Sequence, residues 1–169
     1  MKPQIVEKER IILAGISFFG DPFKNSDGWT EENEIGRLWK RFMGLLSSKK
    51  IRIDEIRKGD IMYEVHVISE EMVQKGKYEV FVGLEIENIK NIPLELLIKV
   101  LPPTTYAVFT LKGEQISSDW PKAIFQEWMP DSGYQEAYAY SFQSYDERFK
   151  GIQYLDESML DVYIPVKKV

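Results

Sequence analysis

The chain has 169 residues, 44% of them hydrophobic and 29% charged, and a formal net charge of −5 at pH 7. This length and composition are typical of one globular domain, so we expect residues 1–169 to form a single domain. The absence of cysteine excludes disulfides, thiolate metal clusters and cysteine nucleophiles, and it fits a cytoplasmic protein. The uncharged apolar run 11–19 is too short to cross a bilayer, so we expect no membrane association.

The sequence offers little for metal or nucleic-acid binding. Its only histidine, His66, excludes a multi-histidine metal site, and we expect neither a metal nor a cofactor. Proteins that bind nucleic acids usually carry a basic surface, whereas basic residues gather here only in residues 49–52 and in Lys167 with Lys168. Such short runs are usually solvated, so we expect no direct nucleic-acid partner.

Hydrophobic periodicity predicts six strands and two helices. The strands are expected at residues 4–18, 61–68, 78–86, 105–111, 138–145 and 159–166. Apolar residues recur at helical spacing over 35–46, with Thr30 as the expected N-cap. They do so again over 116–129, where Ser117, Ser118 or Asp119 could cap the helix and Pro130 with Gly133 would end it. Helical periodicity alone explains both tryptophan-rich stripes, so we interpret them as core.

The elements occur in the order strand, helix, strand, strand, and then in the same order again. This indicates an internal duplication, with pseudo-repeats at about 5–90 and 100–168. Residues 13–20 align with 106–113, residues 63–66 with 142–145, and residues 79–83 with 161–165; the segment 87–103 would connect the halves. Neither half could bury its own apolar face. We therefore predict an α+β fold in which both halves share one antiparallel sheet, with two helices on one face and a ligand cleft on the other.

Strand alternation predicts which side chains meet the helices. The aliphatic positions Val80, Val82 and Leu84 should do so, which places Phe81 and Tyr163 on the opposite face. We expect the polar positions of the two middle strands to share that opposite face. The predicted ligand-binding residues are Glu64, His66, Phe81, Tyr106, Gln143, Tyr145 and Tyr163. Aromatic area with a few polar atoms is typical of small-ligand sites, although a solvent-exposed sheet face would read the same way.

Five segments in a fixed order resemble one known family. They are Ile-Leu-rich residues 11–17, residues 81–85 (FVGLE), residues 106–109 (YAVF) followed by Gly113, residues 127–130 (EWMP) with Gly133, and residues 162–165 (VYIP). In this order they resemble the bacterial gyrase-inhibitor-like family, also known as the effector-binding domain of AraC-type regulators. The similarity runs from about residue 5 to residue 167. It implies two strand-helix-strand-strand modules with a small-molecule pocket at their junction.

One position departs from the family pattern. Members that bind lipophilic cations usually carry a pocket glutamate in a Phe-Glu-x-Tyr-like pattern, whereas this chain has Gln143 between Phe142 and Tyr145. Glutamine offers dipoles but no charge. Glu64 occupies the pseudo-symmetric position and could supply the missing carboxylate; alternatively, it is an ordinary exposed strand residue.

The resemblance implies three functions of different classes. The leading hypothesis is a stand-alone multidrug-binding protein that senses or sequesters aromatic or cationic small molecules, in the context of transcription regulation. A second is a hydrolase of electrophilic small molecules, with Glu64 or His66 as the base and Tyr145 or Tyr163 polarising the substrate. A third is a protein partner, for example a topoisomerase that the chain inhibits.

Overall fold

The computed structural model describes residues 1–48 and 52–169, so the basic residues Lys49 and Lys50 lie outside the described residues. The strands are β1 Gln4–Lys8, β2 Ile11–Gly20, β3 Arg57–Val67, β4 Tyr78–Ile86, β5 Leu97–Leu101, β6 Thr104–Lys112, β7 Tyr134–Glu136, β8 Tyr140–Tyr145 and β9 Met159–Lys168. The helices are α1 Glu34–Ser47, α2 Glu70–Lys75, α3 Glu114–Ser117 and α4 Trp120–Lys122. Shorter helical segments are η1 Ile53–Glu55, η2 Ala123–Trp128, η3 Met129–Asp131 and η4 Ile152–Glu157. No helix in the described ranges is both long and apolar enough to cross a membrane.

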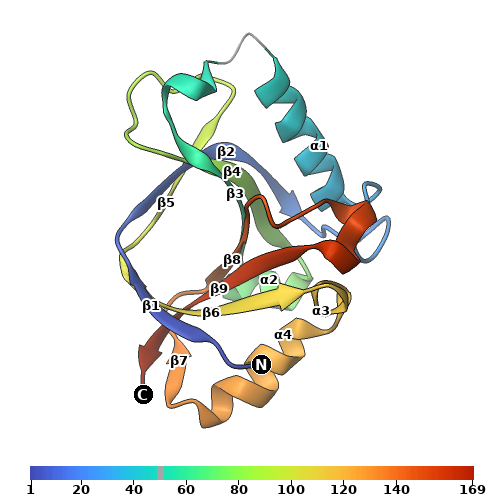
Figure 1. Cartoon of the computed structure of the whole chain (residues 1–169), viewed down its shortest axis with the longest axis vertical. Helices are drawn as coiled ribbons and strands as arrows, with labels where there is room; N and C mark the ends of the chain where they lie inside the picture. The colour runs from blue at the N-terminus through green and yellow to red at the C-terminus, as the bar shows by residue number, and fades with distance from the viewer. Residues whose placement is uncertain (49–51) are drawn as a thin grey trace.

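All strands belong to one sheet in the order β1-β6-β9-β8-β3-β4-β2-β5, with β7 added beside β9. Each pair is antiparallel, and the sheet curls, with α1 at the upper right and α4 at the bottom of Figure 1. The predicted α+β class, with two halves that share an antiparallel sheet, is confirmed. The strand order is symmetric about the β3–β8 pair, where the two halves meet.

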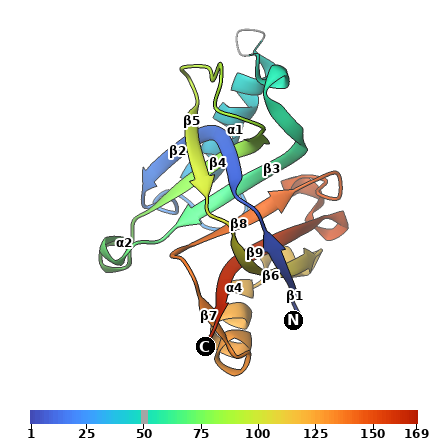
Figure 2. The same cartoon turned by 90° about the vertical axis from the view of Figure 1, so that its left-hand side faces the viewer.

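Two arms, each made of two consecutive strands, close the curled sheet. The chain runs from β1 into β2 and from β5 into β6, and these two arms pair with each other in one register. Lys8 lies opposite Thr104, and Ile11 lies opposite Leu101, so the register continues across both bends. Because β1 and β2 lie near opposite ends of the strand order, this pairing bends the sheet back on itself (Figure 2). The strand predicted at 4–18 is therefore two strands, and β5 lies inside the segment predicted as a connector.

The register corrects one part of the predicted duplication. Tyr63 pairs with Gly83, and its counterpart Phe142 pairs with Tyr163, so Gly83 corresponds to Tyr163. The predicted overlay of residues 79–83 on 161–165 matches Gly83 to Pro165 and is shifted by two residues. An even shift leaves each side chain on the same face of a strand. The predicted faces of β4 and β9 are therefore unaffected.

The N-cap of helix α1 is Asn33, not the expected Thr30. The Asn33 side chain accepts a hydrogen bond from the Gly36 backbone N–H at 2.9 Å, which satisfies one of the free amides of the first turn. Leu38 and Phe42 are buried against the sheet residues Val80, Val82 and Leu84. The predicted contact between these aliphatic positions and the helix is therefore found.

The second predicted helix is broken into α3, α4, a π-helical η2 and a final 3₁₀ turn. Asp119 caps α4 by accepting from the Lys122 backbone N–H at 3.3 Å. Pro121 and Pro130 have no backbone N–H, which favours these interruptions. Ile116 and Ile124 still bury their side chains against Leu160, Val162 and Ile164, on the face of the sheet that α1 also covers.

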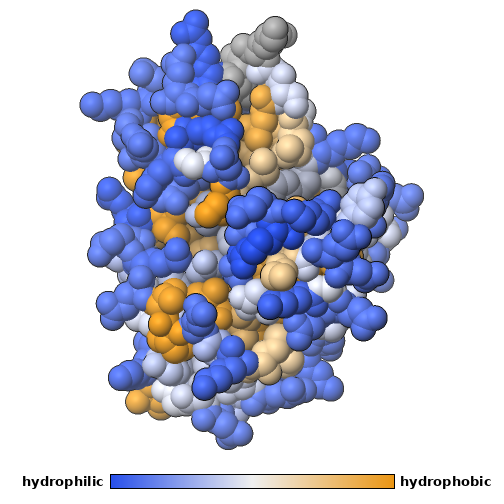
Figure 3. Space-filling view, in the orientation of Figure 1, coloured by the Kyte–Doolittle hydropathy of each residue, from blue (hydrophilic) through white to orange (hydrophobic). Residues whose placement is uncertain are grey.

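The edge strand β5 leaves apolar side chains at the surface. Leu97, Ile98 and Val100 are exposed, as is Ile5 on the other edge strand, β1. In Figure 3 hydrophobic patches on the left lie beside charged and polar surface in the region of these strands. Unpaired edges with charged neighbours are less prone to join other chains.

Two glycines provide a test of the packing between β2 and β4. A Cβ on Gly15 would lie 2.0 Å from the Val82 carbonyl oxygen, whereas a Cβ on Gly44, in the exposed part of α1, meets nothing within 4 Å. We expect Gly15→Ala to lower the unfolding free energy by about 1–3 kcal/mol or more. Gly44→Ala should raise it by about 0.5–1 kcal/mol, because alanine favours helix. Urea unfolding measures both, and a stabilising Gly15→Ala would contradict the register.

Candidate functional site

A large cleft lies between the two helical segments, over the junction of β3 and β8. Its volume is about 1490 Å³, which exceeds that of most drug-sized sites. Helix α1 forms one wall with Ile35, Trp39 and Met43. Helix α4 forms the other wall with Trp120 and Pro121. The floor carries the polar side chains Glu64, His66, Gln143 and Tyr145.

Glu64 lies at the centre of this floor. It pairs across β3 and β8 with Gln143, and both side chains are buried, with 4% and 6% of their residue surface exposed. Trp39 donates its indole N–H to Glu64 Oε2 at 2.5 Å, and His66 Nε2 lies 2.6 Å from Oε1. A buried carboxylate is costly unless such donors surround it. The structure thus holds a buried carboxylate at the floor of a cleft that is lined largely by apolar side chains.

Tyr145 links the two central side chains. Its hydroxyl donates to Gln143 Oε1 at 2.8 Å and lies 3.5 Å from Glu64 Oε2. Burial, followed by the charge of Glu64, raises the pKa of Tyr145 well above 10. The hydroxyl is therefore protonated at neutral pH and remains a hydrogen-bond donor.

Aromatic rings line the walls around Glu64. Trp39 meets Tyr145 edge-on at 5.2 Å between ring centroids, and Tyr145 meets Phe149 edge-on at 4.8 Å. On the other side, Tyr78 stacks on His66 at 5.6 Å. Trp29 also lines the cleft, and its indole N–H donates to the Ile116 carbonyl at 3.1 Å. These rings offer flat apolar area and electron-rich faces to a ligand.

Acidic groups outnumber basic groups around the cleft. Glu31, Glu70, Asp119 and Glu136 line it together with Glu64, whereas the lining lysine is Lys40, which lies 4.0 Å from Glu31. Burial raises the pKa of the Glu136 carboxyl. Lining charges of one sign raise the local concentration of ions of the opposite sign. In the described part of the chain, no cluster of three or more histidine, aspartate and glutamate residues could hold a metal ion.

The structure brings together four of the seven predicted site residues. Glu64, His66, Gln143 and Tyr145 line the cleft, whereas Phe81, Tyr106 and Tyr163 are absent from its lining and belong to the cluster on the opposite face of the sheet. The prediction that all seven share one face is therefore wrong.

The pairing explains this correction. Glu64 lies opposite Val82, and Gln143 lies opposite Val162, and directly opposed residues project to the same face. The polar floor, and with it the cleft, therefore lies on the face that the helices cover, and the predicted position of the cleft on the opposite face is wrong. In β3 and β8, each side chain therefore lies on the opposite face of the sheet from the one that the alternation predicts.

Sequence reasoning missed several cleft residues, chiefly Trp39, Tyr78, Phe149 and Trp120. Trp39 packs against both helix-face core clusters, as the helical periodicity predicts, but it also lines the cleft. Periodicity indicates which side of a helix faces the sheet, whereas it does not show where two helices stand apart. The indole N–H of Trp39, a polar group on an apolar stripe, was the available signal.

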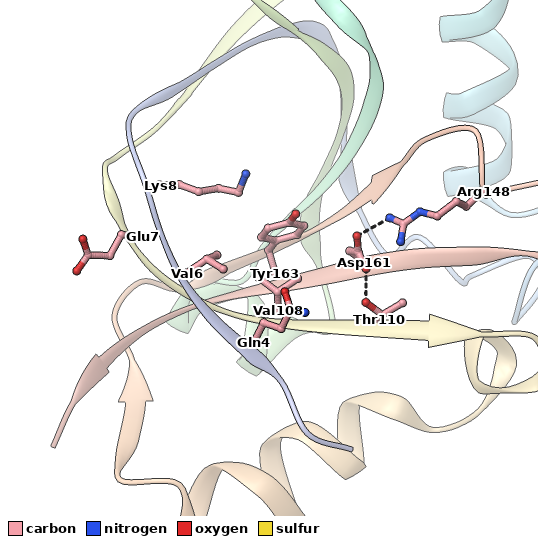
Figure 4. Close-up of a pocket in the computed structure, with 9 residues that line it drawn as sticks. All are labelled: Gln4, Val6, Glu7, Lys8, Val108, Thr110, Arg148, Asp161 and Tyr163. Atoms are coloured by element: carbon pink, nitrogen blue, oxygen red, sulfur yellow. Dashed lines mark hydrogen bonds and ion pairs between the residues drawn. The ribbon is translucent and has the colours of Figure 1, made fainter.

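The remaining predicted residues have other partners. The Tyr106 hydroxyl lies 2.6 Å from that of Tyr140, and the Tyr163 ring stacks on Phe142 at 4.4 Å. Tyr163 also lines a pocket of about 290 Å³ beside β1, with the Lys8 ammonium 5.2 Å from its ring centroid (Figure 4).

Two of the charged groups that line this small pocket, Arg148 and Asp161, form an ion pair with each other. Arg148 donates to Asp146 at 2.7 Å. It also donates to Asp161 at 2.6 Å, and Thr110 donates to Asp161 at 2.6 Å (Figure 4). Such mutual pairing favours a structural role over ligand binding.

Residues 4–166 match the Cass2 family, described as integron-associated effector binding protein. The chain belongs to this family. The match covers nearly the whole chain and confirms the resemblance to gyrase-inhibitor-like effector-binding domains. Binding of a small-molecule effector is therefore the function of the family to which this chain belongs, and the cleft is the candidate site for it.

Individual relatives agree with this assignment. The transcriptional regulator BrlR of Pseudomonas aeruginosa is 29% identical over 98% of this chain, which spans 56% of that protein. The structure of SAV2435 bound to tetraphenylphosphonium has a TM-score of 0.69 at 15% identity, covering 99% of this chain and 94% of that one. EcmrR, in a complex with DNA, has a TM-score of 0.71 at 17% identity, covering 99% of this chain and 58% of that one. The chain thus spans little more than half of the two regulators.

The raised tyrosine pKa values predict a loss of stability in alkali. Above about pH 10 the unfolded chain releases tyrosine protons that the folded chain retains, so the unfolding free energy falls by about 1.4 kcal/mol per pH unit for each such tyrosine. Tyr145→Phe should reduce this slope by the contribution of one tyrosine, as measured by urea unfolding. Tyr154→Phe is the matched control, because 56% of Tyr154 is exposed. Equal slopes in Tyr145→Phe and the native chain would contradict the burial of the hydroxyl.

Proposed function

We propose that this chain binds lipophilic aromatic cations in the cleft between α1 and α4, with Glu64 as the anionic anchor. One observation carries the proposal: a buried carboxylate forms the floor of a cleft whose walls are aromatic. Aromatic faces and a carboxylate both attract cations, and desolvation inside the cleft strengthens both interactions. The tetraphenylphosphonium complex of SAV2435, which shares the fold, supports this ligand class.

The hydrogen bonds of Glu64 favour cations that lack N–H donors. Trp39 and Tyr145 lie on the Oε2 side of the carboxylate, and His66 lies on the Oε1 side. A quaternary cation interacts with the carboxylate through charge alone, so these hydrogen bonds can persist in the complex. The ligand then gains Coulomb attraction without leaving a buried donor unpaired.

The biological role that we propose is to sense or sequester such compounds. The large cleft volume suits several ligands of different shape, as expected of multidrug binding. The chain's negative net charge argues against direct contact with DNA, even though BrlR is a transcriptional regulator and EcmrR forms a complex with DNA. Any effect on transcription would then pass through a partner or through depletion of the free ligand.

Neutralising Glu64 provides the direct test. We expect Glu64→Gln to weaken tetraphenylphosphonium binding by about tenfold or more, since the ligand loses its nearest opposite charge. Binding of neutral triphenylphosphine oxide should change little. Isothermal titration calorimetry of both ligands measures the difference.

Glu85→Gln is the matched control for Glu64→Gln. It removes the same charge outside the cleft, where Glu85 accepts from Lys58 and Tyr63. Equal losses of tetraphenylphosphonium affinity in the two variants would show that net charge, and not a carboxylate in the cleft, governs binding.

Replacing Gln143 tests the opposite change. Gln143→Glu places a second carboxylate directly across the strand pair from Glu64, and two adjacent carboxylates resist joint ionisation. We expect the unliganded variant to melt at a lower temperature than the native chain. Tetraphenylphosphonium should raise its melting temperature by more than it raises that of the native chain, because a cation relieves the repulsion. A smaller ligand-induced increase would place Gln143 outside the binding site.

A further inference from the structure

His66 lines the cleft and contacts Glu64. It is the chain's only histidine, and its Nε2 lies 2.6 Å from Glu64 Oε1. Its side chain is 17% exposed, against 6% for Glu64, so solvent in the cleft reaches the imidazole more readily than the carboxylate. The imidazole is therefore in direct contact both with the proposed anionic anchor and with the space that a ligand would occupy.

The nearest neighbours of His66 come from three strands, and Glu64 is the charged one among them. On β3 its neighbour is Glu64, on β4 it pairs with Val80 and stacks on Tyr78, and on β8 it pairs with Ser141. Burial raises the pKa of Tyr78 above 10, so that hydroxyl keeps its proton near neutral pH.

The other side chains near His66 lie farther along the floor and the rim of the cleft. Trp39 from α1, together with Tyr145 and Gln143 from β8, supplies neutral groups next to Glu64. Glu70 and Glu136 are acidic groups that line the same cleft. No second basic side chain therefore stands beside His66 among these described neighbours.

We propose that His66 selects ligands by charge, admitting cations to Glu64 when the imidazole is neutral and excluding them when it is protonated. This inference rests on the proposed function, since it assigns a specificity-determining residue to the same site. A neutral imidazole can donate its Nε2 proton to Glu64 and leaves the negative charge of the carboxylate uncompensated. An imidazolium at the same distance cancels that charge and repels an incoming cation.

The direction of the effect follows from linkage. If protonation of His66 weakens cation binding, a bound cation must weaken protonation of His66 by the same factor. Cation affinity should therefore fall as the pH decreases through the titration of His66. The affinity for a neutral ligand of similar shape should stay nearly constant.

The test compares the native chain with His66→Gln, which can keep an N–H donor near Glu64 but cannot carry a charge. Calorimetry with tetraphenylphosphonium between about pH 8 and pH 5 should show an approximately tenfold loss of affinity in the native chain. In His66→Gln the affinity should be nearly independent of pH and close to the value that the native chain shows at high pH. Triphenylphosphine oxide is the neutral control ligand.

Glu136→Gln is the control variant, because Glu136 lines the cleft and burial raises the pKa of its carboxyl. It should keep the pH dependence of the native chain. A pH dependence that persists in His66→Gln, or disappears in Glu136→Gln, would overturn the role of His66.

A second measurement does not depend on the variants. Since the chain has one histidine, a single set of imidazole signals reports its titration by NMR. Saturating tetraphenylphosphonium should move this titration to lower pH by about one unit, and triphenylphosphine oxide should not move it. If tetraphenylphosphonium binds equally well at every pH and leaves the imidazole titration unmoved, His66 does not select by charge, and the proposed function stands. If it binds at no pH, both proposals fail.

Discussion

β3 and β8 pair at the centre of the sheet, and the cleft depends on this pairing. It brings together the two halves of the chain, each of which supplies one helical wall, and it places Glu64 directly opposite Gln143. A register slip of one residue between the two strands would turn one of these two side chains away from the cleft. The same pairing that joins the halves thus determines which polar groups form the floor.

The symmetry of the sheet also explains why its two central side chains differ. Glu64 and Gln143 occupy equivalent positions in the two halves and face each other across the junction. Two buried carboxylates at this distance could not both ionise without strong repulsion, whereas one carboxylate and one amide can share the donors of Trp39 and Tyr145. The glutamine at position 143 is therefore compatible with a single buried charge. Retention of that charge at position 64 preserves the chemistry of an anionic site.

Much of the architecture could be predicted from the sequence, because it depends on local periodicity. Alternation placed Val80 and Val82 against the helices, and helical spacing identified Leu38 and Phe42 as buried. The site was harder to predict, because its position depends on how strands pair across the junction. Glu64 lies opposite Val82, a relation between segments far apart in the chain, and no pattern within 61–68 alone fixes that face. Asn33 and the breaks at Pro121 show the same limit for helix ends, where one cap or one missing N–H decides the outcome.

The paired arms formed by β1 with β2 and by β5 with β6 have a mechanical consequence for the cleft. They tie the two halves together at a second seam, separate from the one between β3 and β8. Two halves joined along two seams cannot move apart about a single hinge, so the floor of the cleft would keep its shape if it bound the proposed ligands. Any adjustment to such ligands would then fall to the walls, above all to the short segments α3, α4 and η2, which lack the continuous hydrogen bonding of α1. The molecule thus combines a charge fixed at the bottom of the cleft with one wall built from short, interrupted helical segments.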